Sequence, residues 1–274
     1  MFLEIAIGDA AGAGYEFSNE KISTLGYATH RKHLEIAPGM YTDDTQMTLG
    51  VAETLLSGVW TREAFAQNFV TAFKREPRAG YAGGFQKFLE SVESGEDFLA
   101  CIHPGSDKNG AMMRVLPAAR LDNEQTVREI ARLQASLTHA GPAVLAAEMT
   151  AVAGFLLARG CSSRDLGKEL SVRYQEIDWT QPWDAYVDGK GLPTAEASIK
   201  AVLQNTSMSS ALLSAINFTG DVDSVGAIAM GLGSLAQDYT QDLPEHLFSG
   251  LENGTYGADY LREMDRVFDL RFPR

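Results

Sequence analysis

Apolar residues recur at helical spacing along most of this chain, and that pattern restricts the folds it can adopt. In residues 42–57, Met47, Val51 and Leu55 lie four positions apart, and phenylalanines repeat the spacing in the next segment. Side chains at this spacing share one face of an α-helix. Sustained alternation of apolar and polar residues, which would indicate strands, is nearly absent. The sequence therefore predicts an all-α protein.

The most apolar stretch, residues 141–158, predicts a buried helix. Pro142 suits its first helical position, Gly160 suits its end, and Glu148 in its middle argues against a membrane span. Because no linker, repeat or low-complexity segment interrupts the chain, we expect one compact domain over residues 1–274. Further helices are predicted at 126–137, 162–174, 194–203 and 224–237.

Composition narrows the expected partners and compartment. The formal net charge is −13, and an acidic surface repels phosphate backbones, so we expect no nucleic-acid ligand. The two cysteines, Cys101 and Cys161, lack nearby partner cysteines, which disfavours a disulfide framework and a zinc ribbon. Since the sequence has no basic leader and no membrane span is expected, we predict a cytoplasmic protein. A monomer is the default expectation for its oligomeric state.

Residues 42–45 read TDDT and open a segment that at once turns apolar. Two interpretations fit this stretch alone. Thr42 is a good N-cap, and acids in the first turn of a helix suit its dipole. Alternatively, Asp43 and Asp44 are metal ligands, and then the rest of the chain has to supply partners for them.

Residues 220–224, which read GDVDS, supply such partners. Asp221, Asp223 and Ser224 stand at the start of another apolar helix, about 180 residues after the first pair. Two acidic helix starts that converge in a bundle offer oxygen ligands only, which suits Mg²⁺ first and Mn²⁺ or Ca²⁺ next. Adjacent residues on a helix point about 100° apart, so Asp43 and Asp44 can each face a different metal in a binuclear site.

Three further segments carry weaker signals. GDAAGAGYEF near the N-terminus reads as a Gly/Ala loop before Glu16, a lone acid among apolar neighbours. Asn109-Gly110 reads as a turn entering a helix whose first N–H groups, assisted by Arg114, can bind phosphate. His139 precedes the apolar helix, where histidine is more often structural than catalytic.

The order of these motifs is more specific than any one of them. GDAxGxxxEF, TDDTQM, NGAxMR, THxxP and GDxDSxGA, followed by LPEHLFSGLENG, together resemble the ADP-ribosylglycohydrolase family over nearly the whole chain. The resemblance implies a compact orthogonal helical bundle with two Mg²⁺ ions, or Mn²⁺ in their place. It also implies hydrolysis of an ADP-ribosylated protein at ribose C1″, which releases ADP-ribose. Arginine N-glycosides are the first expectation for the linkage.

Motif positions imply roles for individual residues. Ser224 stands where the family usually has threonine and keeps the hydroxyl. Glu16 matches the family's mobile-loop glutamate, and the proton acceptor is expected to be Glu16, Asp44 or Asp223. By the resemblance, the metal ligands are Thr42, Asp43, Asp44, Asp221, Asp223 and Ser224.

The expected substrate site comes from other segments. Backbone amides of the loops at Gly83–Gly84 and Asn109–Gly110 are expected to hold the diphosphate. The resemblance adds Met113 and His139 near the ligand. An aromatic side chain is expected to stack on adenine, with Phe98, Trp183 and Tyr256 as the candidates.

Competing functions are open at this point. A prenyl-type synthase needs DDxxD, which Met47 breaks, and an HD-type phosphohydrolase needs a His-Asp pair that this sequence lacks. The alternative that remains is a catalytically silent protein of the same fold, which binds ADP-ribose or neutralises a toxin as an immunity protein.

Overall fold

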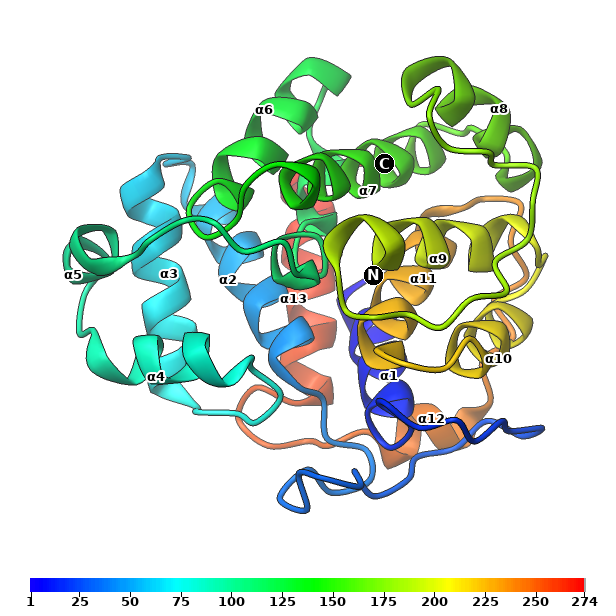
Figure 1. Ribbon diagram of the computed structural model, residues 1–274, viewed down its shortest axis with the longest axis horizontal. Helices are drawn as coiled ribbons and strands as arrows, with labels where there is room; N and C mark the ends of the chain where they lie inside the picture. The colour runs from blue at the N-terminus through cyan, green and yellow to red at the C-terminus, as the bar shows by residue number, and fades with distance from the viewer. Residues whose placement is uncertain (274) are drawn as a thin grey trace.

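The computed structural model describes residues 1–273 and, within them, contains helices and isolated bridges but no sheet. The predicted all-α class is therefore confirmed. Figure 1 shows the helices packed around a central pair, α1 and α11. The α-helices are α1 (Phe2–Ala13), α2 (Asp43–Ser57), α3 (Arg62–Arg75), α4 (Gly83–Ser91), α5 (Gly95–Cys101), α6 (Glu124–Ala135), α7 (Pro142–Ala158), α8 (Ser163–Arg173), α9 (Gly191–Leu203), α10 (Met208–Asn217), α11 (Val222–Leu235), α12 (Glu245–Gly250) and α13 (Ala258–Arg271), and the 3₁₀ turns are η1 (Asn109–Ala111) and η2 (Leu116–Arg120).

The N-terminal Gly/Ala segment is part of helix α1, so the predicted loop is wrong there. Its glycines allow close packing against α11. A Cβ added at Gly8 would lie 2.2 Å from the Gly226 carbonyl oxygen, and one at Gly12 would lie 2.4 Å from Asp223 Cα. The small residues that suggest a loop from sequence therefore serve helix–helix contact. Their effect is to bring the backbone of α1 directly against the start of α11.

Predicted helix ends agree with the observed ones within a few residues. Helix α2 stops at Gly58, whose φ of 75° places it in the left-handed region that favours glycine. Helix α7 begins at Pro142, as expected. Its buried Glu148 is paired with Arg128 and Arg132 of α6, so the charge in the apolar helix is neutralised by a neighbour.

Two parts of the chain differ from expectation. Asn109–Ala111 forms only a 3₁₀ turn, and the Asn109 N–H already donates to the Gly189 carbonyl, at 3.0 Å. This turn therefore does not open a long helix with free N–H groups. The helices α4, α5, α10, α12 and α13 were not among those predicted from the sequence.

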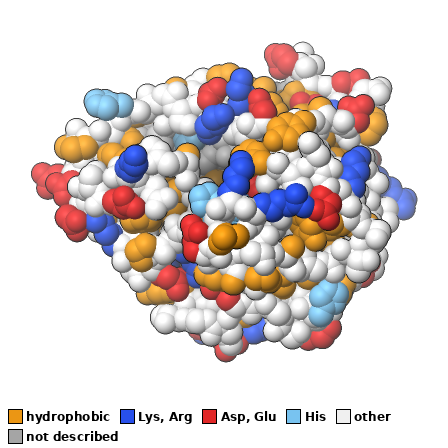
Figure 2. Space-filling model, turned by 60° about the horizontal axis from the view of Figure 1, so that its bottom comes forward, with side chains coloured by type: hydrophobic (Ala, Val, Ile, Leu, Met, Phe, Trp, Pro, Cys, Tyr) orange, Lys and Arg blue, Asp and Glu red, His pale blue; other side chains and the backbone are white. Residues whose placement is uncertain are grey.

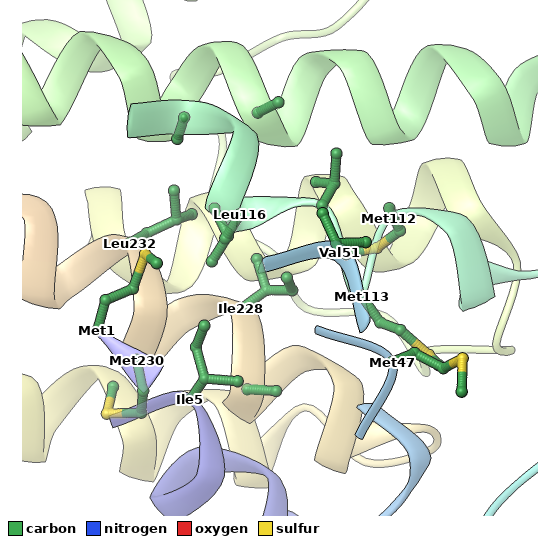
Figure 3. Packing of buried hydrophobic residues seen from close by; sticks show 14 of the residues in the cluster. Met1, Ile5, Met47, Val51, Met112, Met113, Leu116, Ile228, Met230 and Leu232 are labelled. Atoms are coloured by element: carbon green, nitrogen blue, oxygen red, sulfur yellow. The ribbon is translucent and has the colours of Figure 1, made fainter. Parts of the chain in front are cut away.

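One hydrophobic core joins these elements. Figure 3 shows part of it, where Met47 and Val51 of α2 lie among Met112, Met113 and side chains of α1 and α11. Both cysteines are free. Acidic and basic side chains are interspersed on the face in Figure 2, so the excess of acids does not form one patch there. Within residues 1–273, no helix is both long and apolar enough to cross a membrane.

Candidate active site

A cavity of about 600 Å³ opens where the first turns of α2 and α11 meet, and its size is in the range of small-molecule sites. In Figure 1, α4 lies on one side of α2 and α11 lies on the other. The wall combines carboxylates, loop glycines and aromatic rings. Among the residues predicted for the site, those that line the cavity are Glu16, Asp43, Asp44, Gly84, Asn109, Gly110, Met113, Arg114, His139, Asp221, Asp223 and Ser224.

The start of α11 supplies the first acidic group. Carboxylate oxygens of Asp221 and Asp223 lie within 4.8 Å of each other and of an oxygen of Glu16. Backbone bonds fix this corner, because the Asp221 N–H donates to the Val187 carbonyl at 3.0 Å. Gly189 has a φ of 74°, and a Cβ there would lie 2.6 Å from Asp221 Oδ2. A side chain at Gly189 would therefore fill space that the carboxylate uses.

The start of α2 supplies the second acidic group. Asp43 and Asp44 are 8% and 3% exposed, and Asp44 Oδ1 is buried without a hydrogen-bond partner within the described chain. Gly80, with a φ of 114°, approaches from the loop between α3 and α4, and a Cβ there would lie 2.3 Å from Asp43 Oδ1. Glycines from two loops thus leave room beside the carboxylates of both helices.

Asp9, which was not among the predicted site residues, anchors the start of α2. It lies on α1 and is fully buried. Its Oδ1 accepts the Thr42 hydroxyl at 2.8 Å, and its Oδ2 accepts the Thr45 hydroxyl at 2.6 Å. The N–H groups of both threonines also donate to Asp9, each at 3.0 Å. Thr42 is the N-cap by position, but its hydroxyl serves Asp9 and makes no capping bond. Asp9 belongs to the GDAAG motif, and that motif was the one sequence feature that could have indicated its role.

Burial and mutual repulsion dominate the electrostatics of the cluster. Burial raises the pKa of Asp221 to about 6, and it raises that of Asp9 to about 6 against the hydrogen bonds from Thr42 and Thr45. Burial and the neighbouring acids raise the pKa of Asp43, Asp44 and Asp223 well above the usual range. Protein groups alone therefore do not neutralise these carboxylates.

The donor set fits a hard divalent cation. It consists of oxygens only, and one carboxylate oxygen is buried without a hydrogen-bond partner within the described chain. The acids lie at two helix N-termini, where the helix dipole by itself disfavours a cation, so clustered carboxylates are what a cation there requires. Asn109 donates to the Ser224 hydroxyl at 3.0 Å, so Asn109 holds a predicted ligand as well as lining the cavity. Thr42 does not line the cavity, but its hydroxyl proton is bound by Asp9 and its lone pairs are left for another partner.

Glu16 lies beyond the end of α1 and reaches back over the cluster. Its Oε2 contacts Nε2 of His30 at 2.6 Å, and His30 is 1% exposed. No sequence motif marks His30, which lies in a long segment without helix. His30 is therefore not recognisable as a site residue from the sequence alone.

His139 belongs to a hydrogen-bonded chain behind the cavity. Arg114 donates to the Thr138 hydroxyl at 3.0 Å, and Thr138 Oγ1 lies 2.6 Å from His139 Nδ1. Since the Arg114 guanidinium can only donate, the Thr138 hydroxyl is free to donate to Nδ1, which leaves the proton of the ring on Nε2. Burial and the charge of Arg114 lower the pKa of His139 to about 3. The ring is therefore a neutral donor at the cavity wall.

Aromatic rings from α4 line another part of the wall. Phe85 and Phe88 stack with centroids 5.9 Å apart. Phe98, an expected adenine partner, is fully buried behind them and meets Phe88 edge-on at 5.0 Å, so that expectation is wrong. Trp183 and Tyr256 do not line the cavity, and neither does Gly83, although Gly84 does.

Comparison with known proteins agrees with this arrangement. The sequence matches the family model of ADP-ribosylglycohydrolases over residues 4–273. The chain belongs to the ADP-ribosylglycohydrolase family. The resemblance inferred from the motifs is thereby confirmed, and membership of a family of ADP-ribosyl hydrolases supports a glycohydrolase enzyme.

Three named relatives are similar to this chain over different lengths. The ADP-ribosyl-dinitrogen reductase glycohydrolase of Rhodospirillum rubrum is 27% identical over 92% of this chain and 88% of its own. ADP-ribosylhydrolase ARH3 of Mus musculus is 33% identical over 58% of this chain and 48% of its own. ADP-ribosylarginine hydrolase Tri1 of Pseudomonas putida (strain GB-1) is 25% identical over 83% and 67%.

A solved structure gives the same fold. This structure, titled ADP-ribosylglycohydrolase-related protein complex, superposes on this protein with a TM-score of 0.70 and 23% sequence identity. The superposition covers 97% of this chain and 93% of the other. The helical arrangement is thus that of the ADP-ribosylglycohydrolase family.

Proposed function

We propose that this protein removes ADP-ribose from a modified protein side chain by metal-dependent hydrolysis at ribose C1″. The observation that carries the proposal is the meeting of two acidic helix starts in one cavity, with Asp44 Oδ1 buried and unpartnered. We propose two Mg²⁺ ions, with Mn²⁺ as a substitute, because oxygen-only donor sets suit hard cations. The proposed ligands are Thr42, Asp43, Asp44, Asp221, Asp223 and Ser224.

When bound, such ions supply Lewis acidity that binds ribose hydroxyls and acidifies water. The chain's own groups then divide the remaining work. Glu16, half-buried beside the cluster, accepts the proton of the water that attacks C1″, since its carboxylate is held at 2.6 Å by His30 and faces the cavity. The bond between C1″ and the modified side chain breaks in the same step, and the proton passes from Glu16 to the departing side chain. Asp44 and Asp223 stabilise the positive charge that develops on the ribose ring.

The rest of the cavity fits the other parts of ADP-ribose. His139 donates from Nε2 to an oxygen of the ligand, since its Nδ1 already accepts from Thr138. Phe85 and Phe88 line the cavity and are the proposed contacts for adenine. Gly84 and Gly110 line the wall where a side chain would occupy ligand space.

Arginine-linked ADP-ribose is the proposed substrate class. Support for the arginine linkage comes from Tri1, which is named for ADP-ribosylarginine. The Rhodospirillum rubrum relative is named for ADP-ribosylated dinitrogen reductase, which supports a protein substrate and names no linkage. The ARH3 relative is named for ADP-ribosyl hydrolysis without a linkage, so its similarity does not narrow the class.

The test is hydrolysis of defined linkages. The protein is incubated with arginine-, serine- and acetyl-linked ADP-ribose in Mg²⁺, and each reaction is repeated with a chelator. Release of ADP-ribose from the arginine-linked substrate, abolished by the chelator, is the expected result. Binding of ADP-ribose without release from any linkage would instead indicate the non-catalytic protein, and chelator-resistant release would refute the metal requirement.

A further inference from the structure

Glu16 occupies a position that it would not keep unaided. One of its oxygens lies within 4.8 Å of carboxylate oxygens of both Asp221 and Asp223, so like charges repel it. It follows α1 on a short turn, and the next residue, Phe17, has a φ of 52°, which is uncommon for a bulky side chain. Something in the fold has to keep the side chain over the cluster.

The hydrogen bonds of His30 identify which ring nitrogen carries the proton. Ring nitrogen Nδ1 accepts the N–H groups of Lys32 at 3.0 Å and of His33 at 2.9 Å. A proton on Nδ1 would face two N–H donors, so the proton of the neutral ring is on Nε2. The contact at 2.6 Å is therefore an Nε2–H donated to Glu16 Oε2. This hydrogen bond from a fixed donor stabilises the Glu16 side chain in its position beside the cluster.

His30 also connects Glu16 to the rest of its loop. It is buried within the segment 19–42, which contains no helix and runs along the bottom of Figure 1. The turn that its Nδ1 closes brings the Lys32 ammonium 4.8 Å from the centre of the Phe17 ring. Phe17 in turn donates its N–H to the Gly220 carbonyl at 2.6 Å, next to Asp221. One imidazole thus links the turn at 30–33 to Glu16.

We propose that His30 is a positioning residue for Glu16, and that its Nε2–H holds the Glu16 carboxylate over the Asp221–Asp223 pair. The consequence for turnover rests on the proposed role of Glu16 in hydrolysis. The placement of Glu16 does not depend on that role. The two statements can therefore be tested separately.

A matched pair of substitutions separates the two bonds of the ring. In His30→Asn, the side-chain oxygen can still accept from the turn at 30–33, but the amide nitrogen ends short of Glu16. In His30→Gln, the amide nitrogen can still reach Glu16, but the acceptor for the turn is lost. We expect His30→Asn to lower kcat about 10- to 100-fold, the effect of losing one hydrogen bond to a charged group, with KM and Mg²⁺ affinity nearly unchanged. His30→Gln should retain most of the wild-type kcat.

Crystal structures of both variants test the placement without any substrate. The expected result is that Glu16 stays beside Asp221 and Asp223 in His30→Gln and turns away from them in His30→Asn. Glu16 unmoved in His30→Asn would overturn the proposal, as would equal losses of kcat in both variants, which indicate a purely structural histidine. If the wild type hydrolyses no linkage, the proposed function fails, while the crystal structures still decide whether His30 positions Glu16.

Discussion

Asp44 carries the argument for the proposed cation at the scale of a single residue. A carboxylate oxygen that is buried without a donor costs free energy, and Asp44 Oδ1 has no partner within the described chain. The pKa of Asp44 is raised by burial, by Asp9 and by Asp43, so its neighbours add to the cost. Hydrogen bonds from Thr42 and Thr45 to Asp9 hold the start of α2 in place, so Asp44 cannot move away from its acidic neighbours.

Replacing Asp44 by asparagine tests this cost directly. We expect metal-free Asp44→Asn to be at least as stable as the wild type near neutral pH, because one repelling charge is removed. At a Mg²⁺ concentration 100 times the wild-type Kd, each bound ion should add about 2.7 kcal/mol to the unfolding free energy of the wild type, and the variant should lose the contribution of the ion that Asp44 binds. Urea unfolding with and without Mg²⁺ measures both effects.

Asp122→Asn is the matched control, since it makes the same chemical change at an exposed position. It should respond to Mg²⁺ as the wild type does. A full Mg²⁺ response in Asp44→Asn would show that Asp44 is not a ligand.

Among the elements, the contact between α1 and α11 decides where the cluster forms. Because Gly12 has no side chain, α1 packs directly against the backbone of Asp223 at the start of α11. Asp9, on the same helix, binds the start of α2. Helix α1 therefore sets the distance between the two acidic helix starts, although it supplies no proposed metal ligand itself.

Gly12→Ala tests this role of α1. Its Cβ would lie 2.4 Å from Asp223 Cα, so we expect a loss of unfolding free energy and, because α11 has to shift, weaker Mg²⁺ binding. Overpacking of this kind costs about 1–3 kcal/mol. Calorimetric titration with Mg²⁺ and urea unfolding measure the two effects.

Gly154→Ala in α7 is the control for crowding alone. Its Cβ would lie 2.8 Å from Ala119 Cβ, away from the cluster, so stability should fall while Mg²⁺ affinity stays the same. If Gly12→Ala also keeps its Mg²⁺ affinity, the contact serves stability alone.

For the whole molecule, the cluster couples stability to pH. The pKa of Asp9 and of Asp221 is about 6 in the folded protein against an ordinary value of 3.8, so the folded state binds more protons than the unfolded state between these values. The contribution of these groups is therefore greatest at low pH and is lost as the pH rises through about 6. Asp43, Asp44 and Asp223 shift in the same direction.

We therefore expect the metal-free protein to lose stability as the pH rises from about 4 through about 6, and saturating Mg²⁺ to restore it at the higher pH, since cations bind the deprotonated acids. Unfolding free energies measured across this range, with chelator and with Mg²⁺, provide the check. Metal-free stability that rises over the same range would contradict the raised pKa values.

Local patterns determined much of the fold and the proposed metal ligands. Helical spacing predicted α2, α3 and α7, because an amphipathic or wholly apolar helix is a property of neighbouring residues. The two acidic motifs were visible for the same reason. Their family-specific order then identified the family, which no single motif would have done.

Only the tertiary structure decided how these pieces work together. From the sequence alone, the glycines of α1 suggest a loop, and only their packing against α11 explains them. No local sequence pattern identifies the other site residues, which are Asp9, His30, Phe85 and Phe88. Each acts through a partner distant in sequence, and side-chain spacing along a helix says nothing of which other segment will lie against it. The sequence thus contained the acids, whereas their distances, burial and protonation depend on packing between helices.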